Sequence, residues 1–124
     1  MAKILIAEDE RDIGELIALT LRFNGHEVVT TRDGAEAVAQ AQRDQFDLIL
    51  LDVRMPRMNG YEACRLLRTI EATREVPIIF LSAKGQEAEV QAGLEAGADR
   101  YILKPFAPDL LIRKIAEVLG ESEA

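Results

Sequence analysis

The sequence lacks the features that mark disulfide-stabilised, membrane-spanning or exported proteins. Its single cysteine, Cys64, excludes an internal disulfide framework, and apolar neighbours at helical spacing, Tyr61 and Leu67, indicate a buried, inert thiol. No apolar run approaches the ~20 residues that a membrane-spanning helix needs. The N-terminus also lacks the basic and apolar regions of a signal peptide, so we expect a cytoplasmic protein.

Positive charge is also scarce. Asp and Glu outnumber Lys and Arg by 22 to 15, and the net charge is −7. Because proteins that bind the phosphate backbone directly are normally basic, we expect no direct nucleic acid binding by this chain. Its 124 residues fit one globular domain over 1–120, followed by a flexible tail at 121–124.

Apolar runs of strand length alternate with longer stretches of helical period. Strands are predicted near 3–7, 27–30, 47–51, 77–81 and 99–103. Helices are predicted over about 10–23, around 35–42, directly after Asn59-Gly60, over about 85–95 and over about 107–119. This alternation is typical of repeated strand-helix-strand units and therefore predicts an α/β fold with a parallel sheet.

Polar residues follow four of the predicted strands. Glu8 and Asp9 follow the first strand, Asp52 the third, Ser82 the fourth and Lys104 the fifth. Because the carboxyl ends of parallel strands share one edge of a sheet, these side chains should converge on one pocket. Taken singly, each residue could be a helix cap, a turn residue or a solvated lysine. Independent caps have no reason to gather at the same end of four strands. His26 lies away from this edge and is predicted to be a plain surface histidine.

Several separated motifs resemble those of the receiver domain of two-component response regulators. They are Glu8-Asp9, Asp52 with Met55-Pro56 and Asn59-Gly60, Ser82-Ala83, and Lys104-Pro105-Phe106. The resemblance extends from Lys3 to Leu119. It implies a doubly wound, flavodoxin-like fold whose five-stranded parallel sheet has the order 2-1-3-4-5, with helices on both faces. It also implies that Asp52 accepts a phosphoryl group from a sensor histidine kinase or a phosphotransfer protein.

The carboxylates predict a metal ion. Three carboxylates within a few ångströms repel one another unless a cation lies among them, and Mg²⁺ prefers oxygen ligands. We expect Asp9 and Asp52 to bind Mg²⁺ directly and Glu8 to act through water, while the resemblance implies the backbone carbonyl of Arg54 as a further ligand. Lys104 would pair with Asp52 at rest and with a phosphoryl oxygen afterwards.

The resemblance further implies a conformational switch. Ser82 would move toward the phosphoryl group and donate a hydrogen bond to it, and Tyr101 would swing inward from a surface position. The face formed by the fourth helix, the fifth strand and the fifth helix would then bind a downstream effector protein. The same resemblance implies a cis bond between Lys104 and Pro105. We expect a chain that assists its own phosphorylation and dephosphorylation without being an enzyme.

Some positions depart from the family pattern. Val90 and Arg100 stand where regulators with winged-helix output domains commonly carry a basic and an acidic residue, so we expect a monomer or a weak dimer. Arg54 and Lys84 stand at the expected entrance for hydrolytic water and cannot accept its proton at neutral pH, which predicts slow loss of the phosphoryl group.

Other functions are compatible with the fold. A haloacid-dehalogenase-type phosphatase needs a second aspartate two residues after the nucleophile, where this chain has Arg54. A flavodoxin-like cofactor site would place the flavin phosphate beside the acidic run Glu8-Asp9-Glu10, which would repel it. An adaptor that acts without phosphorylation, and a receiver excised from a longer DNA-binding regulator, remain alternatives.

Overall fold

Five strands form one parallel sheet. In the computed structural model, which describes residues 2–83 and 87–123, they are β1 (Lys3–Ala7), β2 (Glu27–Thr31), β3 (Leu48–Asp52), β4 (Ile78–Ser82) and β5 (Arg100–Leu103). All four strand pairings are parallel, and the order is β2-β1-β3-β4-β5. Every residue of β3 and β4 is buried, as the uninterrupted apolar runs of a sheet covered on both faces require. The predicted fold class and strand order are confirmed.

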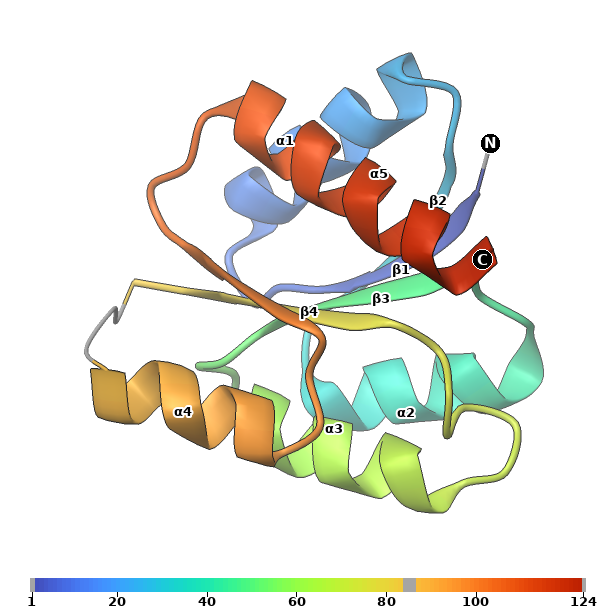
Figure 1. Ribbon diagram of the computed structural model, residues 1–124, viewed down its shortest axis with the longest axis vertical. Coiled ribbons are helices and arrows are strands. Elements are labelled where there is room, and N and C mark those ends of the chain that lie inside the picture. Colours follow the sequence, from blue (N-terminus) through green and yellow to red (C-terminus); the bar gives the residue numbers. More distant parts are fainter. Residues whose placement is uncertain (1, 84–86, 124) are drawn as a thin grey trace.

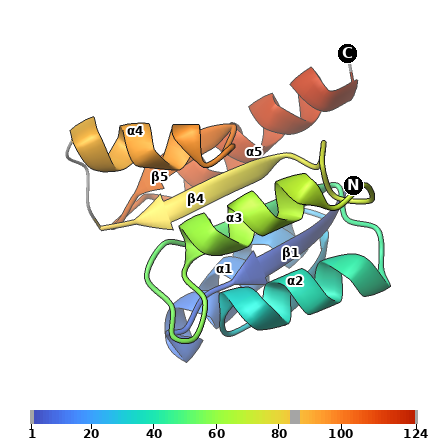
Figure 2. The same ribbon diagram turned by 90° about the horizontal axis from the view of Figure 1, so that it is seen from below.

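Helices cover both faces of the sheet. They are α1 (Arg11–Phe23), α2 (Gly34–Arg43), α3 (Gly60–Thr69), α4 (Glu87–Glu95) and α5 (Pro108–Glu123). Figure 1 shows α1 and α5 on one face and α2, α3 and α4 on the other, and Figure 2 shows this second set from below. Two buried apolar clusters result, one between the sheet and α1 with α5, and one between the sheet and α2 with α3, which also includes Ala96 directly after α4.

The N-termini of α2 and α3 are fixed by side chains that precede them. Asp33 accepts a hydrogen bond from the backbone N–H of Glu36 at 2.8 Å. Asn59 and Glu62 form a reciprocal capping box, in which each side chain accepts from the backbone N–H of the other residue. Such caps satisfy backbone donors that have no partner within the helix. The helix starts are thereby set immediately after the turns that the sequence predicted.

Element boundaries differ from the predictions in a few places. The third, fourth and fifth strands begin one residue later than expected. α5 continues through Glu123, beyond the end expected at about 119 and into the segment predicted as a tail; residue 124 lies outside the described residues, and the flexibility of 121–124 stays a prediction. The start of the fourth helix was expected at about 85, and positions 84–86, including Lys84, also lie outside them.

Two side chains away from the strand ends test the sequence interpretation. Cys64 is fully buried, which confirms its predicted burial, and burial raises the pKa of its thiol to about 11, which disfavours the reactive thiolate. His26 is half-buried, and its Nδ1 accepts a hydrogen bond from the backbone N–H of Ala2 at 3.1 Å. The prediction of a plain surface histidine was therefore wrong.

Along the stretches that the structure covers, no helix is both long enough and apolar enough to cross a membrane.

Candidate functional site

The carboxyl ends of the strands bring the predicted polar residues together. Asp52 is the last residue of β3 and Ser82 the last of β4, while Glu8 follows β1 and Lys104 follows β5. The register places Asp52 opposite Leu81 and Ser82 opposite Leu103 on the neighbouring strands. A hollow of about 340 Å³ opens at this edge. It is lined by Asp9, Glu10, Asp52, Arg54, Ser82, Ala83 and Lys104.

A lysine ammonium lies between two buried carboxylates at the floor of this pocket. Lys104 Nζ is 2.5 Å from Glu8 Oε1 and 3.1 Å from Asp52 Oδ2. The exposed fractions of these side chains are 0% for Glu8, 7% for Asp52 and 16% for Lys104. The expected pairing of Lys104 with Asp52 is present, but the shorter contact is to Glu8, which the sequence interpretation had linked only to the metal.

Backbone N–H groups complete the shell around both carboxylates. Glu8 Oε2 accepts from the N–H of Glu10 at 3.2 Å, and Asp52 Oδ1 accepts from the N–H of Arg54 at 3.4 Å. The second contact is long and therefore weak. Asp52 Oδ1 thus faces the loop that follows β3, whereas its Oδ2 faces Lys104.

Burial makes ionisation of Glu8 unfavourable. Burial is the largest cause of a raised pKa at Glu8, and a hydrogen bond shared with Asp52 acts in the same direction, while the hydrogen bond from Lys104 lowers the pKa; the net result is a pKa of about 8. In the absence of a metal ion, Glu8 therefore takes up a proton more readily than a solvated carboxyl group does. Proton uptake at Glu8 and the Lys104 ammonium both lower the repulsion among the three adjacent carboxylates.

The carboxylates also have the composition of a site for a hard divalent cation. One oxygen from each of Glu8, Asp9 and Asp52 can be chosen so that all three lie within 4.8 Å of one another, and Asp9 is exposed. An all-oxygen set that is open to solvent on one side suits Mg²⁺, which keeps several water ligands. The donor chemistry therefore fits the ion. The part assigned to the Arg54 carbonyl stays a prediction.

Ser82 and Tyr101 lie on neighbouring strands on the α4 side of the pocket. Ser82 is buried, and its carbonyl accepts from the N–H of Lys104 at 2.7 Å. Tyr101 is half-buried, and its ring makes an edge contact with Phe80 at a centroid distance of 6.2 Å. A side chain at Gly93 of α4 would approach the Tyr101 ring to 2.8 Å. This glycine therefore makes room for the Tyr101 ring, and the switch assigned to Ser82 and Tyr101 stays a prediction.

Two features near the pocket were not predicted or were left open. Arg57 pairs with the fully buried Asp33, and Arg57 has a positive φ of 66°. Sequence gave no signal for that contact beyond the turn-like pattern around it. The Lys104–Pro105 bond is cis, as the resemblance implied.

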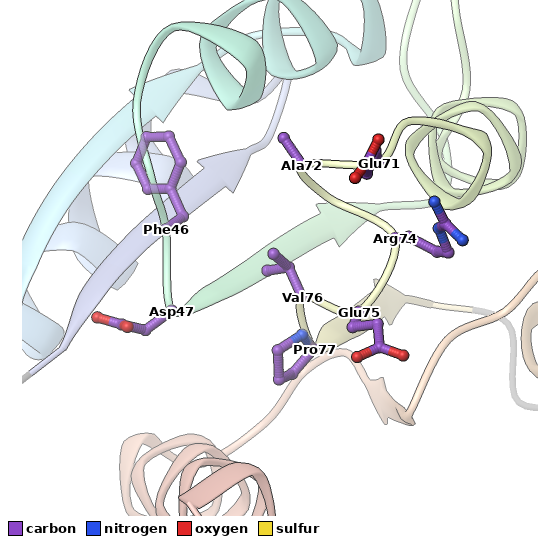
Figure 3. Close-up of a pocket in the computed structure, with 8 residues that line it drawn as sticks. All are labelled: Phe46, Asp47, Glu71, Ala72, Arg74, Glu75, Val76 and Pro77. Atoms are coloured by element: carbon purple, nitrogen blue, oxygen red, sulfur yellow. The ribbon is translucent and has the colours of Figure 1, made fainter.

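A second hollow, of about 590 Å³, lies at the opposite end of the sheet. Figure 3 shows Phe46 and Asp47 on one side of it and the segment from Ala72 to Pro77 on the other. The charged side chains in that view point away from one another. This hollow therefore lacks the convergent groups that distinguish the strand-end pocket.

The comparisons with known proteins agree with the fold. A family model described as the response regulator receiver domain matches residues 4–116. The alkaline phosphatase synthesis transcriptional regulatory protein PhoP of Bacillus subtilis is 40% identical over 121 residues, which are 98% of this chain and 50% of that protein. This chain thus spans about half the length of the curated relatives it matches.

Solved structures with the same fold cover nearly the whole chain. The chemotaxis protein CheY4 of Vibrio cholerae is 36% identical with a TM-score of 0.91, and the match covers 95% of this chain and 98% of that one. The receiver domain of the sensor histidine kinase PA1611 from Pseudomonas aeruginosa is 37% identical with a TM-score of 0.90, covering 96% and 98%. That structure is described as having a magnesium ion coordinated in its active site cleft.

Proposed function

Since this chain belongs to the response regulator receiver domain family, we propose that it is the phosphoacceptor of a two-component system and that Asp52 takes the phosphoryl group. One observation carries the proposal. Asp52 is buried at the end of β3, with the Lys104 ammonium at 3.1 Å and the carboxylates of Glu8 and Asp9 within reach of a shared cation. A solvated turn aspartate would have no need of these partners.

The reaction is an in-line displacement at phosphorus. A carboxylate oxygen of Asp52 forms a bond to phosphorus while the bond from phosphorus to the donor breaks, and the leaving nitrogen or oxygen keeps the electron pair. The protein contributes position and charge rather than a proton relay. Lys104 lies where it can stay paired with the product, and the Ser82 hydroxyl would donate a hydrogen bond to a phosphoryl oxygen. Mg²⁺ bound by Asp9, Asp52 and, through water, Glu8 would supply further neutralisation of the negative charge.

An apolar groove beside the pocket suits a protein phosphodonor. It has a volume of about 410 Å³ and lies between α1 and the start of α5. Its lining consists of Ile13, Leu16, Ile17, Thr20, Ala83, Lys104, Pro105, Phe106, Pro108 and Leu111. Because Ala83 and Lys104 border both hollows, a partner bound in the groove would reach the acceptor. We propose that a sensor histidine kinase or a phosphotransfer protein docks here.

The output of the phosphorylated chain is a protein contact. The relatives differ in this respect, since PhoP is named a transcriptional regulatory protein and CheY4 a chemotaxis protein. We propose that the face of α4, β5 and α5 contacts an effector protein or domain after Tyr101 and Ser82 respond to the phosphoryl group. Val90 and Arg100 do not supply the charge pairs of a dimer at this face, so the chain acts as a monomer or a weak dimer in the cytoplasm.

Incubation with acetyl phosphate and MgCl₂ followed by intact-mass spectrometry tests the proposal. We expect the wild type to gain the mass of one phosphoryl group and Asp52→Asn to gain none. Glu15→Gln, which changes an exposed carboxylate on α1, serves as a control and should be modified like the wild type. A wild type that stays unmodified would favour the adaptor alternative.

A further inference from the structure

The loop between β3 and α3, residues 53–59, begins and ends at the phosphoacceptor. At its start, the N–H of Arg54 faces Asp52 Oδ1 at 3.4 Å. At its end, the N–H of Gly60 donates to the carbonyl of Val53 at 2.9 Å, and a side chain on Gly60 would lie only 2.4 Å from the Asp52 carbonyl oxygen. The conformation of this loop therefore sets what surrounds one oxygen of Asp52.

The far side of the loop is held by the N-terminus of α2. Arg57 Nε donates to Asp33 Oδ2 at 2.9 Å, and its Nη2 donates to the same oxygen. Beside this pair, the N–H of Gly34 donates to the carbonyl of Met58 at 3.0 Å, and a side chain on Gly34 would meet that oxygen at 2.5 Å. Two successive loop residues are thus tied to the N-cap residue and the first residue of α2.

The pair serves the loop rather than the helix. The other oxygen of Asp33 already caps α2 through the N–H of Glu36, so the helix does not need Arg57. The carboxylate of Asp33 is fully buried, whereas 68% of the Arg57 side chain is exposed. Burial alone would raise the pKa of Asp33, but hydrogen bonds from the Glu36 N–H and from Arg57 lower it, so the pair is ionised.

The backbone at Arg57 gives the second argument. Its φ of 66° lies in the left-handed region, which glycine adopts freely and arginine does not. Glycine would fit this turn without strain, yet the chain carries an arginine whose side chain reaches the buried carboxylate. The ion pair offsets the strain and fixes the turn in one conformation.

We propose that Asp33 and Arg57 are positioning residues for phosphorylation, holding the loop at 53–59 so that its backbone faces Asp52. The inference rests on the proposed function of Asp52 as the acceptor. Neither residue touches the reacting atoms. They act through the loop, and weakening the pair should slow phosphoryl transfer while leaving Asp52 and Lys104 in place.

Three variants at Arg57 separate positioning from stability. Arg57→Gly and Arg57→Ala both remove the ion pair, but only glycine relieves the backbone strain, so Arg57→Gly should melt at a higher temperature than Arg57→Ala. We expect both to be phosphorylated by acetyl phosphate about 3- to 10-fold more slowly than the wild type, and to similar extents. Arg57→Lys keeps the charge but loses the paired N–H groups, so its phosphorylation rate should lie between the rates of these two variants and that of the wild type.

Asp33→Asn tests the other partner. Asparagine keeps the cap on α2 and loses the charge, so Asp33→Asn should be phosphorylated as slowly as Arg57→Gly. The double variant with both changes should be no slower than either single variant. Arg43→Ala, which removes an exposed positive charge at the end of α2, is the charge-matched control for the Arg57→Gly and Arg57→Ala variants. It should be phosphorylated at the wild-type rate. Rates that follow melting temperature across the Arg57 series, or a wild-type rate in Arg57→Gly, would overturn the inference.

A second readout does not depend on phosphorylation. In the metal-free protein, the ¹⁵N–¹H signals of Arg54 and Gly60 should shift, and their hydrogen exchange should accelerate, in Arg57→Gly and Asp33→Asn but not in Arg43→Ala. Unchanged signals would reject the positioning role even if no phosphorylation occurred. Failure of wild-type phosphorylation with shifted signals would instead reject the proposed function alone.

Discussion

The raised pKa of Glu8 predicts an unusual dependence of stability on pH. Its pKa is raised from 4.5 to about 8 in the folded protein, so between these values the folded state keeps a proton that the unfolded state has lost. Stability must then fall as pH rises through this window, because the unfolded state binds fewer protons. This direction is opposite to that of a carboxylate stabilised by a salt bridge.

The size of the effect follows from one proton. The slope approaches about 1.4 kcal/mol per pH unit well inside the window, so the free energy of unfolding should fall by about 2 to 3 kcal/mol between pH 5.5 and 7.5. Glu8→Gln carries a permanently neutral side chain of the same shape and should not show this fall. The stability of the variant relative to the wild type should therefore increase by about 2 to 3 kcal/mol between pH 5.5 and 7.5.

Urea denaturation followed by far-ultraviolet circular dichroism, with EDTA present, measures the effect. His26 contributes the opposite slope, because its lowered pKa makes the folded state lose stability as pH falls, but this contribution is common to both proteins and cancels in their difference. Glu15→Gln is the matched control, since the Glu15 side chain is 66% exposed. Parallel stability profiles for the wild type and Glu8→Gln would refute the reasoning.

Four further predictions concern the pocket. Mg²⁺ at ten times its dissociation constant should raise the free energy of unfolding of the wild type by about 1.4 kcal/mol. The same Mg²⁺ concentration should raise the melting temperature of Asp9→Asn much less than that of the wild type. No effect on the wild type would argue against a metal site. Without metal, Asp52→Asn should unfold at the same or a higher urea concentration than the wild type, because Lys104 keeps Glu8 as its partner, and marked destabilisation would show a structural role for Asp52. Arg54→Asn should shorten the lifetime of the phosphoprotein in a decay assay, since a side chain that obstructs water is removed, whereas equal decay rates would exclude that role. Leu16→Ala, at a 60% exposed position on α1, should change the free energy of unfolding by less than about 0.5 kcal/mol. It should slow phosphotransfer from a histidine kinase severalfold and leave the rate of phosphorylation by acetyl phosphate unchanged. Equal losses of rate with both donors would contradict docking in the groove.

The arrangement of the pocket could be predicted because it depends on topology. Glu8, Asp52, Ser82 and Lys104 follow apolar runs of strand length, and parallel strands end at one edge of the sheet. No knowledge of side-chain packing is needed to bring them together. The same reasoning could not show that Lys104 lies closer to Glu8 than to Asp52, because that depends on the depth of each carboxyl group.

Contacts that depend on an unusual backbone conformation, or on the space left by a glycine, could not be predicted. The pairing of Arg57 with Asp33 requires a left-handed arginine, which local preferences disfavour. The position of the Tyr101 ring depends on the space above Gly93, which is a property of helix packing. The extension of α5 was missed because the residues after Leu119 were interpreted as a tail, yet the helix continues through Glu123.

The central claim is that Asp52 carries the phosphoryl group as an acyl phosphate. Reduction of the phosphorylated protein with sodium borohydride converts such a group to homoserine, and peptide mass spectrometry then identifies the position. We expect homoserine at position 52, only after phosphorylation, with Glu8 and Asp9 unchanged. Reduction at Glu8 or Asp9, or a phosphoryl group that resists borohydride and maps to Ser82, would contradict the account.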